Sequence, residues 1–158
     1  MSAPADLARP GPAPADSPLR QTHHRASRAL LVEDEPVVGE LLAEFLTLEG
    51  YEVDRAMDGR EALELVRRQA YALIVSDVRM PDIDGPALYY KLRVTHPALT
   101  RRMVFVTGDM SFETRRFLDE TCLRYLEKPF TIADFRAVVQ GVLAEPPFPG
   151  EGTSAAPP

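Results

Sequence analysis

The residues best suited to chemistry in this sequence stand directly after short apolar segments. They comprise three carboxylates, one hydroxyl and one ammonium: Glu33, Asp34, Asp77, Thr107 and Lys128. If the apolar segments are parallel strands, their carboxyl ends share one rim, where the functional groups of open α/β sheets gather. Clustered carboxylates repel one another, so this rim requires a cation, and hard oxygen ligands of this kind suit Mg²⁺.

Such a rim could carry out phosphoryl chemistry. A carboxylate that lies beside Mg²⁺ and a lysine can attack a phosphoryl group and become an acyl phosphate. The metal ion and the ammonium would stabilise charge on the transferred oxygens, and Thr107 could bond one of them afterwards. Taken singly, Glu33 or Asp34 could equally be a helix cap, and Lys128 with Pro129 a surface turn. The combination with Asp77 and Thr107 is what favours a site.

The rest of the core alternates between strand and helix patterns. Three apolar runs are typical of strands buried on both faces of a parallel sheet: Ala29–Val32, Ala72–Val75 and Met103–Val106. Tyr51–Ala56 alternates like a strand near a sheet edge, and Tyr125–Glu127 forms a short fifth strand. Helical spacing follows each strand, with Pro36 in a first turn and caps at Asp58, Ser111 and Thr131. Five strands alternating with five helices indicate an α/β parallel sheet covered on both faces.

Composition separates this core from two tails. Ten of the 15 prolines lie in residues 1–28 and 146–158, and these Pro/Ala-rich segments are predicted to be disordered. Residues 29–145 form the single predicted domain and hold most of the acidic excess behind the net charge of −6. A pI of about 5.1 argues against DNA binding by bulk charge, and no apolar run approaches the ~18 residues of a membrane span. The single cysteine excludes a disulfide framework and fits the cytoplasm.

Several segments resemble the receiver domain of response regulators in two-component phosphorelay signalling. They occur in the order expected for that family and span about residues 29–144: Leu31-Val32-Glu33-Asp34-Glu35-Pro36, Ser76-Asp77-Val78-Arg79-Met80-Pro81 with Asp84-Gly85, Val106-Thr107-Gly108 and Tyr125-Leu126-Glu127-Lys128-Pro129-Phe130. The segment from Ser111 to Phe130 is most similar to receivers of hybrid histidine kinases. The resemblance implies a flavodoxin-like, doubly wound (βα)5 fold with strand order 2-1-3-4-5.

The resemblance also implies a role for each site residue. Asp77 would be the phosphoacceptor, and Lys128 would pair with the phosphoryl group. The metal ligands would be the following groups: Glu33, Asp34, Asp77 and the backbone carbonyl of Arg79. Thr107 and Tyr125 would be the switch residues, and the peptide before Pro129 would be cis. Tyr125 could also be only a strand aromatic that packs on the sheet.

The resulting function is a phosphorylation-controlled switch rather than an enzyme with external turnover. A histidine kinase or histidine phosphotransfer protein would phosphorylate Asp77, and the face formed by Ser111–Ala144 would then bind a downstream protein. The short segment after residue 145 favours a stand-alone receiver with no direct DNA binding. The alternatives are a detached terminal receiver of a hybrid kinase acting as relay or phosphate sink, a receiver-like module that never needs phosphate, and a small phosphatase.

One departure from the family concerns the end of the helix that begins near Ser111. Thr121-Cys122 stands where many receivers carry Gly-Ala. Without glycine as a left-handed cap, this helix is expected to end in another way. Cys122 itself is predicted to be a small buried residue, and His23-His24 an inert pair within the first tail.

Overall fold

The computed structural model describes residues 27–144. The elements follow one another in this order: β1 (Arg28–Val32), α1 (Pro36–Leu48), β2 (Glu52–Ala56), α2 (Gly59–Arg68), β3 (Leu73–Asp77), α3 (Gly85–Thr95), α4 (Pro97–Thr100), β4 (Met103–Thr107), α5 (Phe112–Thr121), β5 (Arg124–Glu127) and α6 (Ile132–Leu143). The five strands form one parallel sheet in the order β2-β1-β3-β4-β5, which confirms the predicted topology. β1 begins one residue before its predicted start, so residues 27 and 28 of the predicted first tail are described. Residues 1–26 and 146–158 of the two predicted tails lie outside the described residues.

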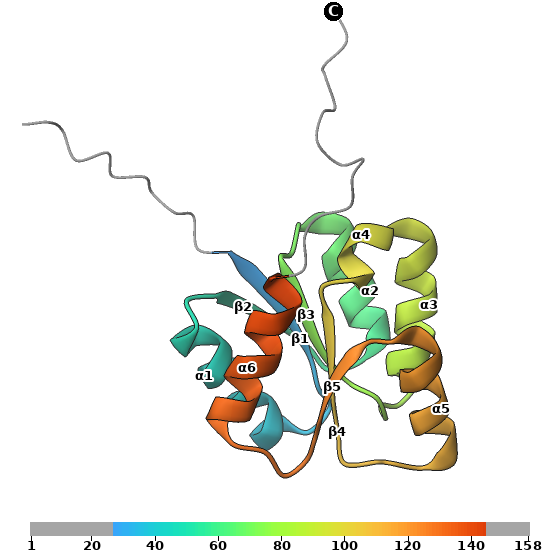
Figure 1. Cartoon of the computed structure of the whole chain (residues 1–158). Coiled ribbons are helices and arrows are strands. Elements are labelled where there is room, and N and C mark those ends of the chain that lie inside the picture. The colour runs from blue at the N-terminus through green and yellow to red at the C-terminus, as the bar shows by residue number, and fades with distance from the viewer. Residues whose placement is uncertain (1–26, 145–158) are drawn as a thin grey trace, which may run out of the picture.

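Alternation of side chains along the strands gives the sheet two apolar faces. Leu30, Ile74 and Phe105 point to the layer of α2, α3 and α5, and each is fully buried there. Their neighbours Leu31 and Val75 point to the opposite layer, formed by α1 and α6. Figure 1 shows these two helical layers on either side of the sheet. Because both faces are covered, the central strands read as continuous apolar runs.

Most helices begin at a residue whose side chain satisfies an exposed backbone N–H. The carboxylate of Asp58 accepts from Glu61 N, and the Ser111 hydroxyl accepts from Thr114 N. Thr131 forms a capping box with the third residue of α6. These three caps and the first-turn proline at Pro36 agree with the sequence analysis.

Two local features differ from the expectations. Five helices were expected, but the described residues include a sixth, the short α4. It begins at Pro97, directly after the His96 cap of α3, because proline lacks the N–H that the first helical turn leaves unbonded anyway. The end of α5 does close in the left-handed region, at Cys122 with φ 54°, although the residue is not glycine. Cys122 is also exposed, so its predicted burial is wrong.

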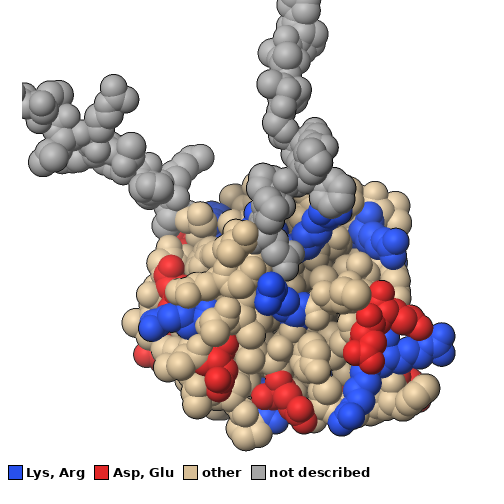
Figure 2. All heavy atoms as spheres, viewed as in Figure 1, with Lys and Arg blue, Asp and Glu red and all other residues tan. Residues whose placement is uncertain are grey.

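The surface of the described part carries both signs of charge. Figure 2 shows acidic and basic side chains next to each other on the face in view, including the region over α5 at the lower right. None of the helices within residues 27–144 is long and apolar enough to cross a membrane.

Candidate functional site

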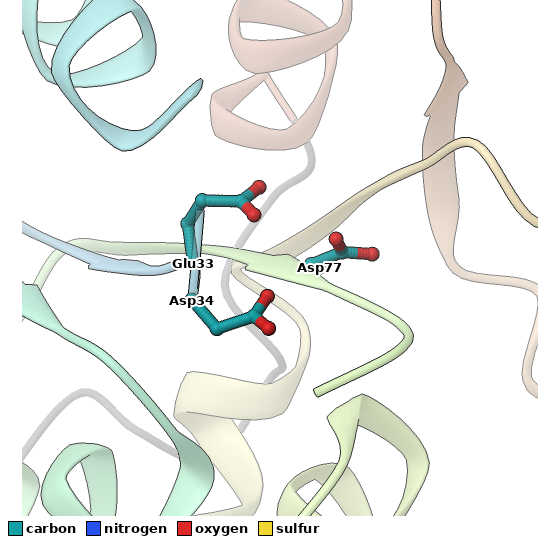
Figure 3. Close-up of side chains that lie close together, drawn as sticks. All are labelled: Glu33, Asp34 and Asp77. Atoms are coloured by element: carbon teal, nitrogen blue, oxygen red, sulfur yellow. The ribbon is translucent and has the colours of Figure 1, made fainter. Parts of the chain in front are cut away.

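Three carboxylates gather at the carboxyl ends of the two central strands β1 and β3. Glu33 and Asp34 follow β1 directly, and Asp77 is the last residue of β3. One carboxylate oxygen from each residue lies within 4.8 Å of the others. In Figure 3 the carboxylates of Glu33 and Asp34 both extend toward the side on which Asp77 lies. The structure therefore brings together the three acidic residues that the sequence analysis assigned to one rim.

Burial makes this cluster electrostatically costly. Only 2% of Glu33 and 7% of Asp77 is exposed to solvent. Burial raises the pKa of Glu33 above its ordinary value of 4.5, and the nearby charge of Asp77 raises it further. Both causes oppose a second negative charge at this place.

Lys128 supplies the positive charge that the cluster needs. Its Nζ lies 3.2 Å from Glu33 Oε2 and 3.3 Å from Asp77 Oδ2. Its backbone N–H donates to the carbonyl of Thr107, which extends the pairing of β4 and β5 by one residue. Burial alone would lower the pKa of Lys128, but the charges of Asp77 and Glu33 outweigh it and the pKa is raised. The Lys128–Pro129 peptide is cis, as the resemblance implies.

The donor set fits a magnesium ion. Three carboxylates face one ammonium, so the cluster keeps an excess of negative charge. Its oxygens are hard ligands, and they come from the rigid ends of two neighbouring strands. The Arg79 N–H donates to Asp77 Oδ1 over 3.2 Å, which holds the loop after β3 against the carboxylate. The metal-binding role of the Arg79 carbonyl stays a prediction.

Gly85 lets the first turn of α3 approach the site closely. A Cβ at this position would lie 2.5 Å from the carbonyl oxygen of Asp77 and 2.7 Å from the ring of Phe105. The Gly85 N–H donates to Val78 O, and this bond closes the loop that follows Asp77. Any side chain at position 85 would push the loop away from the strand, so this glycine shapes the site through packing.

The two predicted switch residues lie on β4 and β5. Thr107 ends β4 and is fully buried. Its hydroxyl accepts the N–H of Asp109 at 3.0 Å and donates to the Asp109 carbonyl at 3.3 Å, and among the described residues it makes no hydrogen bond to Asp77. Tyr125 on β5 is 41% exposed. Their switching roles stay predictions.

One ion pair beside the site was not predicted from the sequence. Arg79 Nε lies 2.6 Å from Asp109 Oδ2 and joins the loop after β3 to the loop after β4. Asp109 also accepts bonds from Ser111 and Thr114 at the start of α5. Hydrogen bonds lower the pKa of Asp109. The bond from Arg79 has the largest effect, and the bond from Thr114 has the next largest. An aspartate two residues before the helix cap Ser111 was the available signal, although no local pattern points to Arg79.

A protein-family profile matches most of this chain. The profile described as the response regulator receiver domain matches residues 29–140. The chain belongs to the response regulator receiver domain family. Receiver domains are phospho-accepting signalling modules, and the resemblance drawn from the sequence is thereby confirmed.

Curated relatives include response regulators and a kinase. The receiver is 37% identical over 130 residues to the response regulator MprA of Mycolicibacterium vanbaalenii, which covers 82% of this chain and 56% of MprA. It is 36% identical over 121 residues to the sensor kinase CckA of Brucella abortus, which covers 75% of this chain and 13% of CckA. The chain thus spans about half the length of the response regulator and a small part of the kinase.

Two similar solved receivers contain magnesium. The response regulator TrrA of Thermotoga maritima, in complex with Mg²⁺ and BeF, superposes with a TM-score of 0.65 at 31% identity and covers 74% of this chain and 99% of its own. The receiver domain of a Pseudomonas aeruginosa sensor histidine kinase has a magnesium ion coordinated in its active site cleft. It superposes with a TM-score of 0.67 at 28% identity, covering 76% of this chain and 99% of its own.

Proposed function

We propose that Asp77 accepts a phosphoryl group from the phosphohistidine of a histidine kinase or histidine phosphotransfer protein, in a reaction that requires Mg²⁺. The observation that carries this proposal is the position of Asp77. Its carboxylate touches Lys128 and lies within one cluster with Glu33 and Asp34. The magnesium ions in the two similar receivers support the same metal here.

The chemistry is a displacement at phosphorus. A carboxylate oxygen of Asp77 forms the new P–O bond while the P–N bond to the donor imidazole breaks, and the imidazole leaves with the electron pair. Lys128 Nζ stays within reach of Asp77 and Glu33 and stabilises charge on the transferred oxygens. When held by Glu33, Asp34 and Asp77, Mg²⁺ supplies the further positive charge that lets two anions approach. The protein turns over only its own aspartyl phosphate, by slow hydrolysis.

The switch follows from the added charge. A phosphoryl group brings about −1.5 to −2 charges and three acceptor oxygens. In this proposal the Thr107 hydroxyl leaves Asp109 and donates to a phosphoryl oxygen, and Tyr125 turns inward into the space that is vacated. The face of α5, β5 and α6, within Ser111–Ala144, then binds its protein partner with a different affinity. Phosphorylation shifts the population between two arrangements rather than creating a new one.

Two candidate functions differ in whether the receiver acts alone or as part of a hybrid kinase. We propose a stand-alone cytoplasmic receiver that signals through protein contacts rather than through DNA, in keeping with the mixed surface charge (Figure 2). The similarity to CckA, of which the chain spans only 13%, favours the second candidate. In that case the chain is the receiver of a hybrid kinase and acts as relay or phosphate sink.

The experiment incubates the protein with Mg²⁺ and acetyl phosphate and follows its intact mass. We expect one added phosphoryl group on the wild type and none on Asp77→Asn. Asp109→Asn is the matched control, because it removes a carboxylate from the same rim outside the cluster, and it should still be phosphorylated. An adduct that persists in Asp77→Asn contradicts the assignment. Complete absence of an adduct on the wild type favours a module that works without phosphate.

A further inference from the structure

Two rim loops are fastened together beside the site by one ion pair. Arg79 stands two residues after Asp77, and Asp109 stands two residues after Thr107. Besides the 2.6 Å contact between Arg79 Nε and Asp109 Oδ2, Arg79 Nη2 donates to the Ser111 hydroxyl at 3.2 Å. Arg79 thus reaches from the loop that carries the phosphoacceptor to the loop that precedes α5.

The other bonds of the Asp109 side chain are local. Its carboxylate accepts from Ser111 N at 3.1 Å, from Ser111 Oγ at 3.0 Å and from Thr114 Oγ1 at 2.8 Å. These bonds hold the carboxylate against the first turn of α5, within its own segment. The bond from Arg79 instead joins residues that are 30 positions apart in the sequence. Within residues 27–144, Arg79 is therefore the partner that ties the Asp109 carboxylate to another loop.

The backbone of Asp109 also forms hydrogen bonds with the hydroxyl of Thr107, the proposed switch residue. Its N–H and its carbonyl are the two groups that bond Thr107 Oγ1. For the hydroxyl to reach a phosphoryl group on Asp77, the backbone at Asp109 must release it and the loop must shift. Arg79 holds the side chain of the same residue and so opposes that shift.

We propose that the Arg79–Asp109 ion pair is a latch that holds the loop between β4 and α5 in its unphosphorylated arrangement. The two side chains play a positioning role, since they act through Thr107, and only the backbone of Arg79 contacts Asp77. The proposal rests on the proposed function, because the latch has meaning only if the loop moves when Asp77 is modified. The size of its effect follows from its exposure. Partly exposed ion pairs shift an equilibrium by about two- to fivefold.

The test measures binding of beryllofluoride, a phosphoryl mimic, to the full chain at saturating Mg²⁺, by titration calorimetry and by the NMR signals of Thr107 and Tyr125. Arg79→Ala should lower the half-saturating beryllofluoride concentration by about two- to fivefold. Arg79→Lys restores the charge and should return the wild-type value. Because both changes break one pair, Arg79→Ala combined with Asp109→Asn should shift binding no further than Arg79→Ala alone.

The matched control is Arg116→Ala. Arg116 forms a similar exposed ion pair with Glu120, at 2.7 Å within α5, but it does not join two loops. Its loss should leave beryllofluoride binding unchanged. The latch is refuted if Arg79→Ala leaves binding at the wild-type value or weakens it, or if Arg116→Ala shifts binding equally. Failure of the proposed function gives a different result, because then the wild type itself takes up neither beryllofluoride nor a phosphoryl group.

Discussion

The rim of the sheet holds a cluster of three carboxylates and, separately, the carboxylate of Asp109, and the two differ in how their negative charge is balanced. Glu33, Asp34 and Asp77 are clustered with one ammonium, and burial together with like charge raises the pKa of Glu33. Asp109 instead accepts hydrogen bonds from the guanidinium of Arg79 and from the hydroxyl groups of Ser111 and Thr114. These bonds, that of Arg79 first, lower its pKa.

Under the proposed function, this difference separates a reaction site from a structural contact. In the proposed function, the cluster with excess negative charge takes up a cation, and Asp77 remains available for a phosphoryl group. The carboxylate of Asp109 instead lies outside the cluster, and its charge is already balanced by a charge-assisted hydrogen bond from Arg79. We therefore expect the chemistry where negative charge is in excess, rather than wherever acidic residues occur.

The largest expected effect is seen when substitutions of the two basic side chains, Lys128 and Arg79, are compared. Lys128→Gln should slow phosphorylation by acetyl phosphate about 100-fold, because it removes the ammonium that stabilises the transferred oxygens. Arg79→Gln should change the same rate by no more than about fivefold, since the side chain of Arg79 contacts only the loop before α5. Initial rates from intact-mass measurements give both values. Equal effects of the two substitutions would mean that the comparison between the clusters is wrong.

The second effect concerns metal affinity. Asp34→Asn should weaken Mg²⁺ binding on the order of tenfold, because it removes one anionic ligand from the cluster. Asp109→Asn should leave Mg²⁺ affinity near the wild-type value. Calorimetric titration of the two variants with Mg²⁺ measures the difference. Comparable loss in both variants would assign the metal to a wider acidic region than the cluster.

The smallest effect is on stability, and its sign differs between the groups. In metal-free buffer at neutral pH, Glu33→Gln should raise the free energy of unfolding by on the order of 1 kcal/mol, because it relieves a buried like charge. Asp109→Asn should lower it, because it breaks the pair with Arg79 and weakens the start of α5. Urea denaturation in the presence of a chelator measures both changes.

The pH dependence checks the cause of these two changes. Glu33 has a folded-state pKa above its ordinary 4.5, so its protonation stabilises the fold fully below pH 4.5 and that contribution is lost as the pH rises through the folded-state pKa. The gain from Glu33→Gln should therefore grow with pH over this range. Asp109 has a lowered pKa, so the loss from Asp109→Asn should be present above its ordinary 3.8 and disappear in acid. Parallel profiles for wild type and Glu33→Gln would exclude burial as the cause.

Much of the fold was predictable because its signals are local. The continuous apolar strands, the first-turn proline at Pro36 and the caps at Asp58, Ser111 and Thr131 depend on residues within one or two turns of chain. The left-handed turn at Cys122 was not predictable in this way. There the connection to β5 fixes the backbone, and tertiary context outweighs the preference for glycine.

The candidate site likewise has one part that the sequence predicts and one part that it does not. Placement of Glu33, Asp34 and Asp77 on one rim follows from strand ends alone, once the strands are known to be parallel. The pairing of Arg79 with Asp109 does not follow, because each residue by itself looks like part of a solvated loop. The side chains meet only because β3 and β4 are neighbours in the sheet.

The sequence by itself determined which groups reach the rim, because local residue patterns define the strands and therefore the residues that follow each strand end. Tertiary structure decided how those groups are neutralised. Lys128 meets Glu33 across 95 positions of sequence, and Arg79 meets Asp109 across 30. Such contacts depend on strand order and on the reach of long side chains, and the balance of charge that distinguishes the two clusters exists only after the sheet has formed.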